Sequence, residues 1–344
     1  MIRCDKLHNA QEVTLVTIRA IRIHAYGGPE VLQIDELSTP IPSSGEAVVR
    51  VAAASVNFID IQKRRGELVG QAFYKRWESS TLPAPMGSQG VGIVEQIGPD
   101  VSNAKPGERV SFWGSSYATH VLVPASRLIH IPGDISFEQA AGGLNQGFLA
   151  YAFTHFAYPV QPGDWCLIQA AAGGIGLLLC QMAKIRQGRV IGVTSSEEKA
   201  PYVREAGAEQ IINSTTSDIS AEVRRITKGR GVNVVYDGVG KDVFEANLDS
   251  LAPAGYLVIY GQSSGFIPPF DLMRLQEKGS LFITRTNGLP YAHEYPAYVE
   301  KFAAWVRDKK LFIRIARTYP LEDAAQAHEA FEQRKVSGRV LLLP

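Results

Sequence analysis

Hydrophobic and polar positions change their spacing along the chain. From residue 18 to about residue 145, short runs rich in Val and Ile are interrupted by Pro and Gly, a pattern typical of β-strands and turns. From about Ser136 onward, apolar runs of strand length alternate with amphipathic segments of helix length, including one predicted helix over residues 242–255. This alternation predicts a parallel sheet with helices on both faces. We therefore expect an α/β protein in which a β domain is joined to a doubly wound parallel sheet.

The segment AAAGGIG, residues 170–176, lies between an apolar strand and a helical segment. On the spacing G-x-G-x-x-G the chain has Ala171, Gly173 and Gly176. Small residues at this spacing let the backbone turn tightly, bring its N–H groups near a diphosphate and let the helix pack closely on the strand. The N-terminus of the helix favours the negative charge. We therefore predict a dinucleotide-binding turn rather than a turn that is tight for structural reasons alone.

The residues at the end of the second strand of this sheet indicate whether the cofactor is NAD or NADPH. Folds that bind NAD usually carry Asp or Glu there, about 20 residues after the turn, to bind the ribose 2′-hydroxyl. This chain has VTSSEEKA instead, so that Ser195 stands at the strand end and Lys199 follows one turn later. A lysine there pairs with a 2′-phosphate, which favours NADPH. The alternative is that Lys199 is an ordinary surface lysine.

Composition narrows the class of protein further. The chain has 344 residues, 45% of them apolar, and a net charge of +1, so no basic excess indicates nucleic acid or an anionic membrane. No apolar run approaches the roughly 20 residues of a membrane span.

The three cysteines form no CxxC pair, which argues against a disulfide framework and favours the cytoplasm. Residues 1–17 lack the apolar core of a secretion signal and are predicted to be an N-terminal extension.

Short motifs that belong together occur along the chain from about residue 18: YGGPEVL (26–32), SVNFIDI (55–61), AAAGGIG (170–176), VVYDGVG (234–240), YGQSSG (260–265), KGSLFITR (278–285) and SGRVLLLP (337–344). With these motifs the chain resembles the zinc-independent quinone oxidoreductases of the ζ-crystallin type, in the medium-chain dehydrogenase/reductase superfamily. The resemblance implies a GroES-like β-barrel catalytic domain, formed by residues 18–146 and 287–344, around a Rossmann domain of residues 147–286. It also implies an active site in the cleft between the domains and a homodimer formed mainly through the Rossmann sheets.

The resemblance also implies roles for individual residues. Asn57 is expected to be catalytic, beside the nicotinamide and the substrate, although an Asn at a strand end also serves as a turn cap; Asp60 is expected to be structural or helix-initiating. The implied cofactor contacts are Gly173, Gly174, Ile175 and Gly176 at the diphosphate, Ser195 and Lys199 at the adenosine phosphate, Tyr260, Gly261, Gln262 and Ser263 near the nicotinamide and its ribose, and Arg334 from the C-terminal segment. Zinc-dependent relatives carry Gly-His-Glu where this chain has Gly87, Ser88 and Gln89. Neither serine nor glutamine is a good zinc ligand, so we expect no metal.

Without a metal to act as Lewis acid, hydride delivery to an electron-poor acceptor needs less help than alcohol oxidation does. We therefore expect NADPH-dependent reduction of quinones. Two alternatives stay open: NADPH-dependent reduction of the double bond of an enone or alkenal, which requires a proton donor, and an NADPH-binding protein without important turnover. Phe73, Tyr74 and Trp77 lie close together in the sequence and either line the mouth of the substrate site or only pack against the fold.

Overall fold

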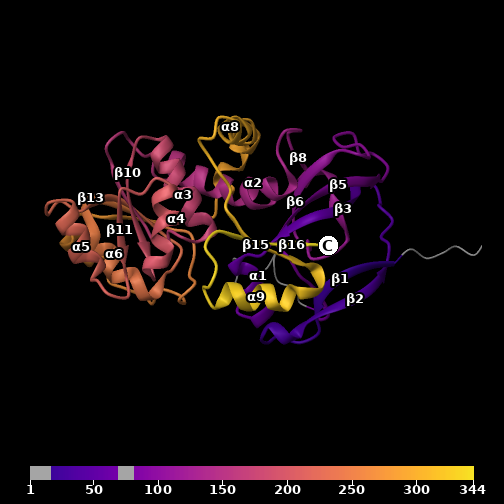
Figure 1. Cartoon of the computed structure of the whole chain (residues 1–344), viewed down its shortest axis with the longest axis horizontal. Coiled ribbons are helices and arrows are strands. Elements are labelled where there is room, and N and C mark those ends of the chain that lie inside the picture. Colours follow the sequence, from indigo (N-terminus) through magenta and orange to yellow (C-terminus); the bar gives the residue numbers. More distant parts are fainter. Residues whose placement is uncertain (1–16, 69–80) are drawn as a thin grey trace, which may run out of the picture.

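The computed structural model describes residues 17–68 and 81–344. Residues 1–16 of the predicted extension, and the aromatic residues Phe73, Tyr74 and Trp77, lie outside the described residues. Thr17 already belongs to the first strand. The described chain forms a largely antiparallel β part and a parallel sheet with its helices, which stand side by side (Figure 1).

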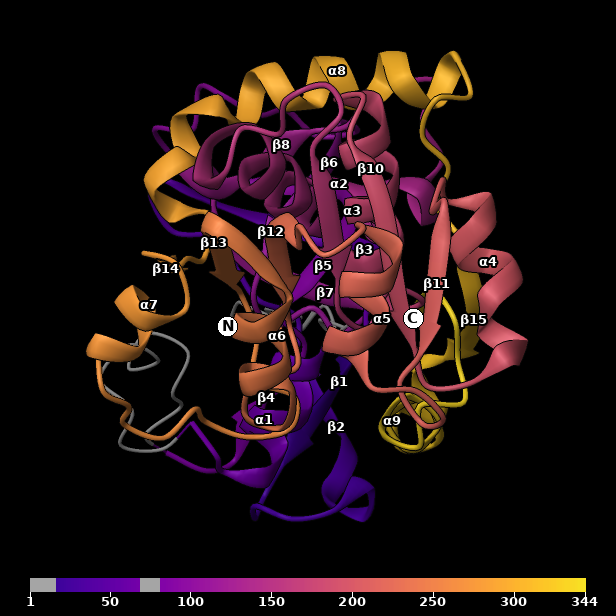
Figure 2. The same cartoon turned by 90° about the vertical axis from the view of Figure 1, so that its left-hand side faces the viewer.

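The parallel sheet contains six strands from the middle of the chain, namely β9 (Trp165–Ile168), β10 (Arg189–Thr194), β11 (Gln210–Asn213), β12 (Val232–Asp237), β13 (Leu251–Ile259) and β14 (Phe282–Arg285). Their order is β11-β10-β9-β12-β13-β14, and all neighbours are parallel. One face is covered by α3 (Gly174–Ile185) and α4 (Ala200–Glu205), the other by α5 (Ile219–Ile226) and α6 (Phe244–Ser250) (Figure 2). The central strand β9 is buried along its whole length, as a strand with helices on both faces must be. The predicted doubly wound sheet and the α/β class are confirmed.

The β part uses strands from both ends of the chain, namely β1 (Thr17–Ile23), β2 (Leu32–Ser38), β3 (Glu46–Ser55), β4 (Ala84–Pro85), β5 (Gln89–Ile97), β6 (Arg109–Trp113), β7 (His120–Pro124), β8 (Ile129–His130), β15 (Ile315–Pro320) and β16 (Arg339–Leu343). One sheet has the order β15-β16-β3-β5-β6-β8, with β7 also paired to β3, and a smaller sheet has the order β2-β1-β4. Helices α1 (Phe58–Arg65) and α9 (Ala324–Glu332) pack beside these sheets (Figure 1). Because β16 pairs with β3, the C-terminal strands complete a sheet that the N-terminal segment begins.

Helix α2 (Phe137–Ala152) lies between the two parts (Figure 1). Its predicted cap is present, since the Ser136 hydroxyl accepts a hydrogen bond from the Gln139 backbone N–H at 3.1 Å. Its buried side chains join one apolar core with residues of α3 and of α8 (Tyr295–Arg307). The predicted domain boundary between residues 146 and 147 falls inside this continuous helix, and the boundary stays a prediction.

The predicted helix over residues 242–255 is wrong in its second half. Helix α6 ends at Ser250, and β13 starts at Leu251. Pro253 lacks the N–H group that a helix interior needs, and Ala254 has a φ of +58°, in the left-handed region. These two residues interrupt the pairing of β13 with β12, whose register shifts at this point, so that the apolar residues continue as a strand. A further short helix that the sequence did not indicate, α7 (Met273–Glu277), precedes β14.

Candidate functional site

The turn between β9 and α3 has the tight geometry that its small residues allow. Ala170 has a φ of +48°, and Gly173 caps α3 from an extended conformation. An ideal Cβ on Gly176 would lie 2.4 Å from the backbone oxygen of Ala170, so the close approach of helix and turn requires glycine. The residues predicted at a diphosphate lie in this turn and in the first turn of α3: Gly173, Gly174, Ile175 and Gly176. Because the first N–H groups of a helix have no partners within it, this position suits an anion.

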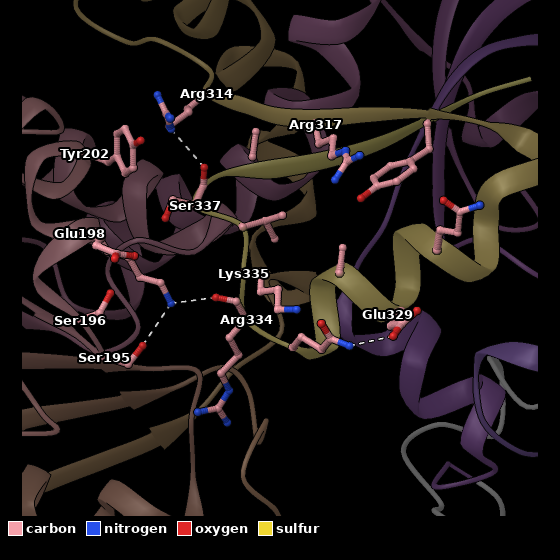
Figure 3. A pocket seen from close by; sticks show the side chains of 17 residues that line it. Ser195, Ser196, Glu198, Tyr202, Arg314, Arg317, Glu329, Arg334, Lys335 and Ser337 are labelled. Carbon is pink, nitrogen blue, oxygen red and sulfur yellow. Dashed lines mark hydrogen bonds between the residues drawn. The ribbon is translucent and has the colours of Figure 1, made fainter.

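At the carboxyl end of β10, Lys199 is one of the residues that line a pocket of about 940 Å³. Figure 3 shows this pocket, with Ser195 and Arg334 among its labelled residues. The Nζ of Lys199 donates hydrogen bonds to the hydroxyl of Ser195 at 3.1 Å and to the backbone oxygen of Arg334 at 2.9 Å. Partial burial and the charge of Arg334 lower the pKa of Lys199. The charged residues that line the pocket are mostly cations: Lys199, Arg314, Arg317, Arg334 and Lys335, against Glu198 and Glu329. Ser195 and Lys199, which were predicted at the adenosine phosphate, and Arg334, which was predicted to approach from the C-terminal segment, therefore lie together in surroundings that favour a phosphate.

The loop after β13 holds the residues predicted near the nicotinamide, which are Tyr260, Gly261, Gln262 and Ser263. The Tyr260 ring stacks on Phe153, with centroids 5.3 Å apart. Arg285, at the end of β14, donates to the backbone oxygen of Gly261 at 2.9 Å and to Oε1 of Gln262. The loop therefore packs at the carboxyl edge of the parallel strands, which is the same edge as the Gly-rich turn and the edge where such sheets bind ligands.

Asn57 lies between β3 and α1, and its side chain is almost fully buried. Its amide nitrogen donates to the hydroxyl of Ser88 at 2.9 Å. Its amide oxygen accepts from Nε2 of Gln146 at 3.1 Å and from Nη2 of Arg339 at 2.9 Å. Four segments thus meet at the amide group of Asn57 and determine its orientation: the start of α1, the segment before β5, the middle of α2 and the start of β16.

Asp60, in the first turn of α1, is the acceptor for a group of buried donors beside Asn57. Its Oδ2 accepts from the backbone N–H of Asn57 at 2.9 Å, the hydroxyl of Ser88 at 3.1 Å and the hydroxyl of Tyr117 at 3.3 Å. Burial raises the pKa of Asp60 to about 6, although these donors and the charge of Lys63 favour the carboxylate. Asp60 therefore accepts from the backbone N–H of the N-cap residue Asn57, in agreement with a helix-initiating role, and its carboxyl lies one hydrogen bond from Ser88.

The donors to Asp60 extend to a buried histidine. His328 is fully buried, and burial and the nearby charge of Arg64 lower its pKa to about 3, so the ring is neutral. Arg64 can only donate, and its Nη1 lies 3.2 Å from Nδ1 of His328, which is therefore the acceptor nitrogen. Nε2 then carries the proton and donates to the hydroxyl of Tyr117 at 3.1 Å. The hydroxyl of Tyr117 accepts this hydrogen bond and donates its own proton to Asp60. The donations therefore run in one direction, from Arg64 through His328 and Tyr117 to Asp60.

Sequence reasoning did not single out Gln146, Tyr117, His328 or Arg339. Arg339 lies within a quoted motif, SGRVLLLP, but a buried arginine cannot be recognised without the fold. Tyr117 and His328 are separated by 211 positions, and nothing in the pattern of either segment links them.

Strand β16 brings the surroundings of Asn57 to the Gly-rich turn. The N–H of Gly338 donates to the backbone oxygen of Ala172 at 3.0 Å, and Gly338 forms a parallel bridge with Gly173. The neighbouring residue Arg339 reaches α3, where a Cβ on Gly174 would lie 2.6 Å from its Nη1. Asn57 and the predicted diphosphate turn are therefore linked through neighbouring residues of one segment, Gly338 and Arg339.

Within residues 17–68 and 81–344, no three His, Cys, Asp or Glu side chains lie close enough together to hold a metal ion. Where zinc-dependent relatives carry Gly-His-Glu, Ser88 bonds to Asn57 and Asp60, and Oε1 of Gln89 is buried without a partner among the described residues. That the enzyme needs no metal stays a prediction.

A doubly wound sheet with a Gly-rich turn, joined to a β part built from both chain ends, is the arrangement that the resemblance implied for medium-chain dehydrogenases and reductases. Two family models match the chain: the alcohol dehydrogenase GroES-like domain over residues 43–133, and the zinc-binding dehydrogenase model over residues 174–304. The first match falls on the β part, and the second runs from the start of α3 through the later strands of the parallel sheet into α8.

Individual relatives are similar over nearly their whole length. Quinone oxidoreductase 1 of Escherichia coli is 35% identical over 333 residues, covering 94% of this chain and 99% of that protein. The crystal structure of Escherichia coli quinone oxidoreductase complexed with NADPH has a TM-score of 0.88 at 35% identity, covering 95% of this chain and 100% of that chain. The 2-haloacrylate reductase of a Burkholderia species is 36% identical over 341 residues, covering 95% and 99%. The chain belongs to the quinone oxidoreductase family, and the predicted resemblance is confirmed.

Proposed function

We propose that this protein is an oxidoreductase that reduces quinones with NADPH. The observation that carries the proposal is the pocket at the end of β10, where Lys199 and a surplus of cations replace the carboxylate of NAD-binding folds. The relatives named quinone oxidoreductases, one of them crystallised with NADPH, support the same acceptor and cofactor.

The residues of the site fit the cofactor at both ends. Ser195, Lys199 and Arg334 would hold the 2′-phosphate, and the turn that includes Gly173 and Gly176 would hold the diphosphate. Near Asn57, two buried polar atoms lack partners among the described residues, namely Oε1 of Gln146 and Nε of Arg339. Buried groups of this kind are costly unless a ligand satisfies them. When bound, NADPH supplies the hydride that reduces the acceptor.

The chain's own contribution to the reaction is to orient the reactants and to exclude water. In our proposal the nicotinamide lies between Asn57 and the loop of residues 260–263, in a cleft between the two domains. Asn57, Ser88 and Gln146 are each at most 6% exposed, and their mutual hydrogen bonds hold the amide of Asn57 in one orientation. A preorganised, dry site avoids reorganisation during hydride transfer.

The proposed domains are residues 18–146 with 287–344, and residues 147–286. We further propose a homodimer formed through the outer strand β14, because exposed large apolar residues belong to this strand, α7 and the loops around them: Phe266, Leu272, Met273, Phe282 and Leu289. Figure 2 shows α7 and β14 at the same edge of the sheet. An exposed edge strand with apolar side chains is an association surface. No helix within the described residues is long and apolar enough to cross a membrane, and we propose a cytoplasmic enzyme.

A second candidate function is the reduction of activated double bonds. The relative named 2-haloacrylate reductase favours it, because an acrylate carries an α,β-unsaturated carboxyl group. Such a reaction needs a proton for the α-carbon, and sequence reasoning found no donor. Asp60 has a raised pKa, but it is buried, and Ser88 links it only to the amide nitrogen of Asn57, which is itself a donor, so these hydrogen bonds carry no proton to a substrate. An NADPH-binding protein without turnover is the remaining alternative.

The test is the initial rate of NADPH oxidation by the purified, chelator-treated protein, with quinones and with α,β-unsaturated ketones, aldehydes and acids as acceptors. Fast turnover with quinones supports the proposal, and a preference for unsaturated carbonyl compounds supports the second candidate. Tight NADPH binding without turnover of any acceptor would leave the non-catalytic alternative as the better description.

The cofactor assignment has a separate test in Lys199→Ala, with NADH measured in parallel. Loss of one charged hydrogen bond should raise the Kd for NADPH about tenfold and leave the Kd for NADH unchanged. Lys184→Ala, which removes an exposed lysine on α3, is the matched control. Equal losses for both nucleotides in Lys199→Ala would contradict the assignment of the 2′-phosphate.

A further inference from the structure

The side-chain amide of Asn57 has two ends of nearly the same shape, so its hydrogen-bond partners decide which end faces which side of the site. On one side lies Nη2 of Arg339, which can only donate, 2.9 Å from the amide oxygen. On the other side the amide nitrogen lies 3.3 Å from the backbone oxygen of Ser55, which can only accept, and 2.9 Å from the hydroxyl of Ser88. A hydroxyl group both donates and accepts, so Ser88 favours this orientation only when its own proton is bound elsewhere.

Asp60 is the group that binds the proton of Ser88. Its Oδ2 accepts from the Ser88 hydroxyl at 3.1 Å, which leaves the Ser88 oxygen as an acceptor for the amide nitrogen of Asn57. The same Oδ2 accepts from the backbone N–H of Asn57 at 2.9 Å and so ties the first turn of α1 to this arrangement. Both Asp60 and Ser88 are buried. The carboxylate thus selects the orientation of the amide through one hydroxyl group.

The ionised form of Asp60 suits this arrangement, and the protonated form does not. A carboxylate only accepts, whereas a neutral carboxyl group accepts more weakly and adds a donor. Tyr117 is poorly placed to bind an added proton, because its hydroxyl already accepts from Nε2 of His328 at 3.1 Å and donates to Asp60 at 3.3 Å. A proton on Oδ2 would therefore point toward Ser88 and turn the hydroxyl of Ser88 toward the amide nitrogen of Asn57, which is itself a donor.

Among the described groups that face one another in this cluster, Asp60 is the one whose charge changes near neutral pH. Burial raises its pKa to about 6. Burial lowers the pKa of His328, on α9, to about 3 and raises the pKa of Tyr117 above its ordinary 10.0, so both are neutral between about pH 5 and about pH 8. The cations that face Asp60 are Lys63, on the same helix, and Arg339, from β16. Burial lowers the pKa of both, that of Arg339 to about 10.

We propose that Asp60 and Ser88 are positioning residues for Asn57: the carboxylate binds the hydroxyl proton of Ser88, and the Ser88 oxygen then holds the amide nitrogen of Asn57. This inference rests on the proposed function, in which Asn57 lies beside the nicotinamide. A misplacement of about 1 Å can cost about 100-fold in rate. Loss of this orientation should therefore slow hydride transfer more than it weakens binding of the dinucleotide.

The experiment measures hydride transfer in a single turnover by stopped flow, with NADPH and the acceptor that the wild type reduces fastest. At about pH 8, Ser88→Ala and Asp60→Asn should each lower this rate about tenfold. Both should leave the Kd for 2′-phospho-ADP-ribose, which lacks nicotinamide, within about twofold of the wild type. Ser88→Thr keeps the hydroxyl group and should retain most of the rate. Ser44→Ala is the matched control, because it removes an exposed hydrogen bond from a serine to Asp100.

Two further readouts separate positioning from general damage to the fold. Between about pH 8 and about pH 5 the rate of the wild type should fall about fivefold, although the folded protein gains stability over part of this range, and Asp60→Asn should show no such fall. In the background of Asn57→Ala, Ser88→Ala should have no further effect on the rate, because both changes act on the same amide group.

The emission of bound NADPH reports the surroundings of the nicotinamide without any turnover. It should change in Ser88→Ala and in Asp60→Asn and stay as in the wild type in Ser44→Ala. If the wild type binds NADPH but reduces no acceptor, the proposed function is wrong, and this emission decides the inference.

Three results would overturn the inference. The first is an unchanged rate and emission in Ser88→Ala, and the second is a fall of rate with pH that persists in Asp60→Asn. The third is a loss in Ser88→Ala that adds in full to the loss in Asn57→Ala, because Ser88 would then act independently of Asn57. Ser88→Ala and Asp60→Asn are measured separately, so either variant decides the question if the other does not fold.

Discussion

The carboxyl group of Asp60 should make the stability of this protein rise on mild acidification. Burial raises its pKa from an ordinary 3.8 to about 6. The folded protein therefore binds this proton more tightly than the unfolded chain does, and gains stability as the pH falls through about 6 toward 3.8. Above this range the carboxylate is charged in both states, and its burial costs about 3 kcal/mol at 1.36 kcal/mol for each pKa unit.

Asp60→Asn keeps the size of the side chain and one acceptor oxygen but removes the titration. Relative to this variant, the wild type should gain about 1.3 kcal/mol of unfolding free energy between about pH 7 and about pH 5. The assay is urea unfolding of the cofactor-free protein at several pH values, followed by tryptophan fluorescence and circular dichroism. Comparison with the variant at each pH cancels the titration of the carboxyl groups that both proteins share.

Asp134→Asn is the matched control, because Asp134 is exposed and the hydrogen bond from Arg307 lowers its pKa. The Asp134 carboxylate contributes stability above about pH 3.8, and this contribution is lost only as the pH falls below that value. The difference in unfolding free energy between the wild type and Asp134→Asn should therefore stay constant between about pH 7 and about pH 5. If the unfolding free energy of the wild type minus that of Asp60→Asn stayed constant or fell on acidification, the reasoning would be refuted. The hydrogen bonds to the carboxylate and the charge of Lys63 would then outweigh its burial.

Gly176→Ala should abolish NADPH binding and lower the free energy of unfolding by about 1–3 kcal/mol, because the new Cβ would lie 2.4 Å from a backbone oxygen. Gly133→Ala, where a Cβ meets nothing within 4 Å, should change neither nucleotide titrations nor thermal melts. Burial raises the pKa of Cys166 and that of Cys180, the latter to about 12, so a thiol reagent at neutral pH should leave both unmodified in the folded protein, as peptide mass mapping would show. Phe282→Glu should convert the proposed dimer to a monomer in light scattering, and a monomeric wild type would exclude that interface.

Features that depend on short stretches of chain could be predicted from the sequence. The alternation of apolar runs and helical segments indicated the parallel sheet, and its strands occur in the expected order of the chain. The Gly-rich turn was recognisable because the need for Gly176 arises from backbone atoms only five and six positions away. Ser195 and Lys199 are likewise one helical turn apart, so their contact follows from local geometry.

Local pattern was insufficient where a few residues changed the course of the backbone. The apolar residues after Ser250 fit a helix or a strand, and Pro253 and Ala254 favoured the strand. The boundary after residue 146, which the resemblance implied, falls inside α2 and stays a prediction, and α2 is buried at nearly every position from Ala140 to Ala152. Periodicity shows which face of a helix is buried, but not which neighbour buries it.

By itself, the sequence determined the class of fold, the tight Gly-rich turn before α3 and the presence of Lys199 rather than a carboxylate after β10, because each depends on residues that are neighbours in the chain. Only the tertiary structure decided what surrounds Asn57. Gln146 and Arg339 bond to one amide across 89 and 282 positions, and Asp60 acquires its raised pKa from burial beneath segments far from it in the chain. Burial and long-range hydrogen bonds are properties of the packed molecule, and no local pattern of residues contains them.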